Sequence, residues 1–233
     1  MATQGHGFNI IPALAGALVS FVCYAFVDDT DVIHAEHSTS TPGEEVIREM
    51  QIVLDRWGGV LRATGGALVP SKSYWYAIDF AWDGAKWSYR SISDMPGQIL
   101  ITGVDGKRVV LKRHEPSVGQ ETLGVMQAMD GNNKDEVIHL RKKADAFADS
   151  MRTGYPSNND AWFALTATIM KTMEYPMATT TLSQSEWEHV MFPILQAGLP
   201  RSEIDRSFPH TVLFGPTILQ GMGVMHPWYH QKP

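Results

Sequence analysis

Two adjacent carboxylates, Asp28 and Asp29, follow a long uncharged apolar run and are the clearest chemical signal in the sequence. Like charges this close raise each other's pKa unless a cation or solvent relieves them. Mg²⁺ prefers hard oxygen ligands and is usually held by one or two carboxylates together with substrate phosphates. The pair therefore indicates a site for Mg²⁺, with Mn²⁺ as a substitute, or a solvated acidic turn, which is the commoner use of Asp between strands.

The segments on either side of the pair predict how it is held. Residues 18–27 are rich in β-branched and aromatic side chains, and Val32 and Ile33 resume the apolar run beyond the acids. That composition is typical of strands. We expect a β-hairpin with Asp28 and Asp29 at its tip.

The apolar run must also be weighed as a membrane segment. Residues 8–27 contain no charged side chain and are about long enough to span a bilayer as a helix. Asn9, Pro12, Gly16 and Ser20 weaken that interpretation, and no basic stretch precedes the run as in a signal peptide. We expect a buried strand preceded by a loop and no membrane partner, and keep a small membrane-associated protein as a third hypothesis.

Composition allows an ordinary globular protein. The 233 residues are 44% hydrophobic, enough for one or two domains with a real core. The single cysteine, Cys23, excludes an internal disulfide framework, so we expect an intracellular protein of the cytoplasm or nucleus that is not secreted. The net charge of −6 disfavours a general nucleic-acid binder, although basic clusters occur at residues 107–114 and 141–143. Either cluster could be a solvated face.

The first half of the chain predicts a sheet with one good helix. A helix starts after residues 39–45, continues at helical spacing to Trp57, and is expected to end at Gly58-Gly59. Residues 72–80 are expected to form a strand. Asp83-Gly84 and Asp105-Gly106 each separate two apolar segments and indicate hairpins.

The second half changes to helical patterns. Residues 136–151 and 161–173 have helical composition and spacing, and the prolines after residue 175 are expected to divide the remainder into short helices. These prolines are Pro176, Pro193, Pro200 and Pro209. We therefore predict an α+β protein with an antiparallel sheet, a packed helix and a following helical region, and place the domain boundary between residues 130 and 131.

Several other chemistries lack their sequence signals. The segment from His34 to His37 contains the His and Glu of a zinc deaminase, but that site needs two further cysteines. Neither a Gly-x-Ser-x-Gly nucleophile elbow nor a phosphate-binding P-loop is present. The aromatic residues between 74 and 89 could stack on bases, although packing within strands is the commoner use.

The order of the parts resembles the C-terminal part of a reverse transcriptase palm, in particular that of retrotransposon enzymes. Residues 26–29, Phe-Val-Asp-Asp, resemble the family's motif C, in which two Asp lie on a catalytic hairpin. Lys72, in Leu68-Val69-Pro70-Ser71-Lys72, resembles the lysine of motif D, and Leu123-Gly124 the Leu-Gly near the primer grip. These motifs cover roughly the first half of the chain.

The resemblance implies a palm-like fold, a function and a set of roles. The function is RNA-directed DNA polymerisation by two-metal phosphoryl transfer, with RNA template, DNA primer and dNTPs as partners. Asp28 and Asp29 would be metal ligands, and Lys72 a catalytic charge stabiliser or proton donor. Residues 1–130 would be the palm segment and residues 131–233 a thumb-like region. Contacts to nucleic acid would come from Leu123, Gly124, Arg141, Lys142 and Lys143.

The family's fingers, its motif A strand with a further metal-binding Asp, and motif B have no counterpart in these residues. We therefore expect the polypeptide to be a fragment, to bind Mg²⁺ weakly, and to be inactive unless another segment completes the site. The alternative is a non-catalytic interaction module in which the acidic turn is incidental.

Overall fold

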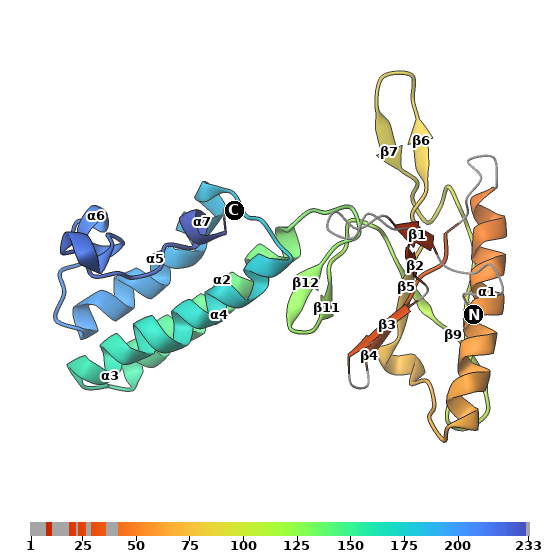
Figure 1. Cartoon of the computed structure of the whole chain (residues 1–233), viewed down its shortest axis with the longest axis horizontal. Coiled ribbons are helices and arrows are strands. Elements are labelled where there is room, and N and C mark those ends of the chain that lie inside the picture. The colour runs from red at the N-terminus through yellow and green to blue at the C-terminus, as the bar shows by residue number, and fades with distance from the viewer. Residues whose placement is uncertain (1–7, 11–18, 22, 27–28, 36–41, 232–233) are drawn as a thin grey trace. The chain divides into compact units, whose positions relative to one another are not determined.

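The computed structural model describes residues 8–10, 19–21, 23–26, 29–35 and 42–231. It divides into two compact units, Met1–Pro116 and Ser117–Pro233. Helices and strands are both present, so the protein is of the general α+β kind that the sequence predicted. The first unit carries most of the strands and the second most of the helices (Figure 1).

Short paired strands make up the sheet structure of the first unit. The described residues of this unit form five pairs, of which β5–β10 is parallel and the others are antiparallel. The antiparallel pairs are β1 (Phe8–Ile10) with β2 (Val19–Phe21), β3 (Cys23–Phe26) with β4 (Asp29–Val32), β6 (Phe80–Trp82) with β7 (Trp87–Tyr89), and β8 (Leu100–Thr102) with β9 (Arg108–Val110). The parallel pair joins β5 (Tyr74–Tyr76) to β10 (Lys112–His114).

The two Asp-Gly hairpins predicted from the sequence are confirmed. β6 and β7 flank Asp83-Gly84, and β8 and β9 flank Asp105-Gly106. Gly84 and Gly106 have φ values of 88° and 77°. Glycine occupies that left-handed region without the steric cost of a Cβ, which is why these turns form where they do.

The long helix of the first unit, α1 (Gly43–Ala63), runs past the point at which the sequence predicted its end. Gly58 and Gly59 lie inside the helix, so that prediction is wrong. The helix ends instead at Thr64, where Gly65 takes a φ of 85° and the amide of Gly66 donates to the carbonyl of Leu61. A left-handed glycine with this return bond is the usual helix terminator, and a glycine pair in helical conformation is not.

The core of the first unit lies between α1 and β8. Ile47 of α1 packs with Ile99, Ile101 and Leu111, and all four are buried. Gln51 adds a polar clamp, because its side-chain amide donates to the carbonyl of Leu100 at 2.8 Å and accepts from the amide of the same residue at 2.7 Å. Both backbone groups of Leu100 are thereby satisfied by one side chain.

Helices dominate the second unit. They are α2 (Lys134–Thr153), α3 (Asn158–Phe163), a π-helical segment (Ala164–Ile169), α4 (Met170–Glu174), a 3₁₀ turn (Tyr175–Ala178), α5 (Gln184–Arg201), α6 (His210–Leu213), a 3₁₀ turn (Thr217–Leu219) and α7 (Pro227–His230). One antiparallel pair, β11 (Gln120–Thr122) with β12 (Val125–Gln127), precedes them. Figure 1 shows α2, α4 and α5 running side by side.

Two of the four prolines do not end helices as predicted. Pro193 and Pro200 lie inside the 18-residue α5, whereas Pro176 falls in a 3₁₀ turn and Pro209 caps α6. The helix tolerates Pro193 because tertiary packing holds it. Its neighbours Val190, Ile194 and Leu199 are fully buried.

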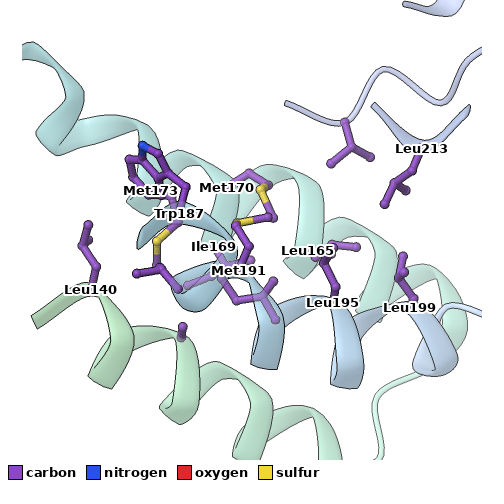
Figure 2. Close-up of a cluster of buried hydrophobic side chains, with 14 of the residues drawn as sticks. Leu140, Leu165, Ile169, Met170, Met173, Trp187, Met191, Leu195, Leu199 and Leu213 are labelled. Carbon is purple, nitrogen blue, oxygen red and sulfur yellow. The ribbon is translucent and has the colours of Figure 1, made fainter. Parts of the chain in front are cut away.

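One hydrophobic cluster holds the second unit together. Figure 2 shows its buried side chains spread along the space between the helices, with Met173 beside Trp187 at one end and Leu199 at the other. Trp187 is fully buried, and its indole Nε1 donates to Oε1 of Gln231 at 2.7 Å. The indole thus contributes apolar area without leaving its N–H unsatisfied.

The described helices include none long and apolar enough to cross a membrane. Within the apolar run of residues 8–27, the described residues form the strands β1, β2 and β3.

Candidate functional site

The strands that flank the acidic pair form the antiparallel arrangement that the sequence predicted. Cys23 pairs with Val32, and at the other end Phe26 pairs with Asp29. Asp29 is the first residue of β4 and is exposed to solvent. Asp28 lies outside the described residues. Asp29 is thus available to a metal ion at the end of the strand pair.

The far end of β4 is fixed to α1. His34, two residues beyond the strand, contacts a carboxylate oxygen of Glu49 through its Nε2 at 3.1 Å. The His34 side chain is only 2% exposed, so this contact is largely shielded from solvent. It ties the strand pair to the helix that carries the core of the unit.

The acidic turns at Asp83 and Asp105 show what an ordinary Asp turn looks like in this protein. The carboxylate of Asp83 accepts hydrogen bonds from the amides of Lys86 and Ala85 at 2.8 and 2.9 Å. These bonds to the ionised form lower the pKa of Asp83. Asp105 accepts from the amide of Lys107 at 3.1 Å. Each of these turns uses a single Asp to cap its own backbone.

The described residues assemble no group of three His, Cys, Asp or Glu side chains that could hold a metal ion. Asp29 is a hard, exposed oxygen donor and suits Mg²⁺ as one ligand of a set. Of the two predicted metal ligands, the structure describes Asp29 alone, as an exposed carboxylate at the start of β4.

Lys72 lies before the strand it was predicted to begin. Pro70–Lys72 forms a 3₁₀ turn, and β5 starts only at Tyr74. Pro70 favours this turn because its fixed φ suits the first helical position. The Lys72 side chain is exposed, which leaves its amine accessible.

Leu123 and Gly124 form the connection between β11 and β12. Their φ values are 51° and 80°, and positive φ at both central residues is the geometry of a type I′ hairpin turn. Leucine is a costly residue in that region, where Asn or Gly is usual. The Leu123 side chain is 41% exposed. The strained backbone and exposed side chain of Leu123 make this turn a candidate functional site.

Two of the three basic residues predicted to bind nucleic acid lie near this turn. Burial lowers the pKa of His139, and the charges of Lys143 and Lys142 lower it further. The charge of Glu121 and the backbone of Gly124 oppose this lowering. Glu136 of the same helix accepts the amide of Met126 in β12, so α2 carries both lysines on the helix that contacts this hairpin.

Arg141 points elsewhere. Its guanidinium donates to Asp145 at 3.0 Å and to the carbonyl of His189 in α5 at 2.7 Å. Its helix neighbours Lys142 and Lys143 form no such bond among the described residues. The three consecutive basic side chains at positions 141–143 therefore lie in different environments. Their clustering in the sequence does not show this.

Three residues at the β11–β12 turn were not singled out from the sequence. Glu136 is 1% exposed, and its Oε2 accepts the amide of Met126 at 2.6 Å. Burial raises the pKa of its carboxyl. Tyr175 donates its hydroxyl to the carbonyl of Leu123 at 2.8 Å. Glu136 thus connects β12 to α2, and Tyr175 connects the turn to the 3₁₀ segment that it begins. Glu136 and His139 are three residues apart on a helix, a spacing visible in the sequence, whereas Tyr175 carries no local signal.

Comparison with protein family models, with curated proteins and with solved structures finds no match for this chain. The resemblance to reverse transcriptases therefore stays a prediction that depends on the motif residues themselves.

Proposed function

We propose that the chain is a fragment of an RNA-directed DNA polymerase, with a palm-like first part that presents Asp28 and Asp29 to catalytic metal ions. One observation carries this proposal: β3 and β4 are antiparallel, and β4 opens on the exposed Asp29. An acidic pair at the end of two short paired strands is the arrangement that motif C requires. The turns at Asp83 and Asp105 offer only one acid each.

The metal would be Mg²⁺, with Mn²⁺ able to replace it. When bound, such ions activate the attacking hydroxyl of a primer and stabilise the leaving pyrophosphate. Asp28 and Asp29 would hold the ions, while Lys72 would place a positive charge beside the triphosphate. The exposed position of the Lys72 side chain is compatible with that role.

RNA template and DNA primer would be bound by the second unit. The Leu123-Gly124 turn would contact the nucleic-acid backbone, with Lys142 and Lys143 as phosphate partners. Arg141 has its guanidinium engaged by Asp145 and His189, so we assign it a lesser part in this binding.

The fragment by itself would not polymerise. A two-metal site of this family uses a further carboxylate from motif A, and the resemblance assigns no residue of this sequence to it. We propose that a separate fingers and palm segment is the partner that completes the site.

Metal binding tests the proposal directly. Mn²⁺ titrated into ¹⁵N-labelled chain should broaden the amide resonances of β3 and β4 at sub-stoichiometric metal. Asp28→Asn and Asp29→Asn should each abolish that broadening, and Mg²⁺ should compete with it. Asp105→Asn is a matched control, since it alters an exposed acid of another hairpin turn in the same unit.

A primer-extension assay completes the test. A DNA primer on an RNA template should be bound by the wild-type chain but not extended with Mg²⁺ or Mn²⁺. Robust extension by the isolated chain would refute the proposed dependence on a partner. Mn²⁺ broadening that is unaffected by both Asp28→Asn and Asp29→Asn would refute the metal site itself.

One observation favours the alternative, a non-catalytic interaction module. Phe80 and Tyr89 pair across β6 and β7, as do Trp82 and Trp87, and all four side chains are between 39% and 66% exposed. An exposed aromatic face of this kind is unusual for a monomeric surface. If the module hypothesis holds, Asp29→Asn leaves metal and nucleic-acid binding unchanged, while Trp82→Ala abolishes binding to a protein partner.

A further inference from the structure

The β11–β12 turn is held by side chains that come from outside its own strands. Each strand has only three residues, and the turn between them places Leu123 in the left-handed region at a φ of 51°. A two-stranded hairpin of this size is marginally stable by itself. Something other than its own ladder must therefore fix the conformation of the turn.

One contact from outside the hairpin comes from Tyr175. Its hydroxyl donates to the Leu123 carbonyl at 2.8 Å, across 52 positions of sequence. Its ring also lies against the other turn residue, because a Cβ built on Gly124 would meet Tyr175 Cε1 at 3.9 Å. The side chain is nevertheless 60% exposed, so it contributes little to the hydrophobic core. Its contacts are made with the turn.

Helix α2 holds the hairpin from other positions. Glu136 accepts the amide of Met126, and Asp135 accepts the amide of Gly119 at 2.5 Å. These contacts fix the strands, and Tyr175 fixes the carbonyl of the strained residue at the tip.

We propose that Tyr175 is a positioning residue that holds Leu123-Gly124 in the conformation in which this turn contacts the backbone of a bound RNA–DNA hybrid. The inference depends on the proposed function, since the hybrid is the ligand assigned to the second unit. The exposed Leu123 side chain would contact the sugar, and the nearby Lys142 and Lys143 would meet phosphates. A turn fixed before binding loses less conformational entropy when the ligand arrives.

The test uses the full chain and a 5′-fluorescein DNA primer annealed to an RNA template. Tyr175→Phe removes only the hydroxyl. It should raise the Kd measured by fluorescence anisotropy about threefold to tenfold, the factor expected for one neutral hydrogen bond. It should also speed amide hydrogen exchange at Gly124 and Val125 while leaving exchange in α2 unchanged. Tyr155→Phe, at another exposed tyrosine of the same unit, should change neither quantity.

A second variant separates contact from folding. Leu123→Asn suits the left-handed conformation, so the turn should remain ordered and exchange at Gly124 should stay slow. Loss of the leucine contact should still weaken hybrid binding.

The outcomes are distinguishable. The inference is overturned if Tyr175→Phe leaves Kd unchanged, whether or not the turn loosens, while the wild type binds the hybrid normally. Failure of the wild-type chain to bind the hybrid at all overturns the proposed function, and this inference with it.

Discussion

The side chain of Arg141 replaces the backbone hydrogen bond that Pro193 cannot make. Proline has no N–H, so the carbonyl four residues earlier in α5, that of His189, loses its helical donor. The Arg141 guanidinium donates to that carbonyl at 2.7 Å. A side chain of α2 thereby provides the donor that this carbonyl of α5 lacks, and α5 continues through Pro193 to Arg201.

This relationship predicts a coupled pair of substitutions. Arg141→Ala should lower the free energy of unfolding by about 1–2 kcal/mol, since it strands a backbone carbonyl. In a Pro193→Ala background the backbone N–H returns, so the cost of Arg141→Ala should fall by about 1 kcal/mol. Urea denaturation of the four proteins of this cycle measures the coupling. Arg152→Ala, at an exposed ion pair with Asp149, should cost less than about 0.5 kcal/mol. Equal costs of Arg141→Ala in both backgrounds would contradict the relationship.

The two hydrogen bonds between Gln51 and the backbone of Leu100 predict that replacing this glutamine with the isosteric glutamate lowers the stability of the protein. Gln51→Glu keeps the acceptor for the Leu100 amide but replaces the donor with a charged oxygen facing the Leu100 carbonyl. It should cost about 1–3 kcal/mol, with faster amide exchange at Leu100. The same substitution at Gln184, an exposed residue of α5, should cost under about 0.5 kcal/mol. Identical losses at the two positions would show that the clamp contributes nothing specific.

Glu136 predicts a pH dependence of stability. Burial raises the pKa of its carboxyl above the ordinary value of 4.5, while the Met126 amide and Lys143 oppose the rise and Glu121 adds to it. The folded state then binds more protons than the unfolded state just above pH 4.5. The contribution of Glu136 to stability is therefore fully present below pH 4.5 and is lost as pH rises through the folded pKa.

Glu136→Gln should abolish that dependence because the amide does not titrate. The unfolding free energy of the wild type minus that of the variant should be greatest below pH 4.5 and should decrease toward neutral pH. Urea denaturation at several pH values measures this difference. The other titratable groups of the chain are present in both proteins, so their effects largely cancel in this difference. A difference that grows with pH would contradict the assignment.

Local patterns predicted those elements whose signals are themselves local. The Asp-Gly pairs specify their own hairpins, because glycine at positive φ is a property of the turn alone. The helical spacing of the apolar residues in 136–151 specifies α2 for the same reason, because one apolar stripe within the segment is enough to predict a helix. The antiparallel strand pair around the acids was also predicted, but Asp29, expected at the hairpin tip, is the first residue of β4 and pairs with Phe26.

Tertiary contacts explain what the sequence did not predict. Pro193 leaves the carbonyl of His189 without a helical donor, and Arg141, which is far from it in the chain, donates to that carbonyl. Tyr175 meets Leu123 across 52 positions. The three cations 141–143 form a cluster in the sequence, but helix geometry directs Arg141 toward α5. No pattern among neighbouring residues of the sequence contains such relationships.

The glycines of α1 provide a decisive comparison. Gly59 lies inside the helix, where an added Cβ would meet no atom within 4 Å. Gly59→Ala should therefore raise the free energy of unfolding by about 0.5–1 kcal/mol, since alanine restricts the unfolded chain and favours the helix. Gly65, at a φ of 85°, terminates the helix, so Gly65→Ala should lower stability by about 1 kcal/mol. Thermal and urea unfolding of the two single variants measure the contrast. If α1 instead ended at Gly58-Gly59, Gly59→Ala would be the destabilising substitution, and Gly65→Ala would have little effect.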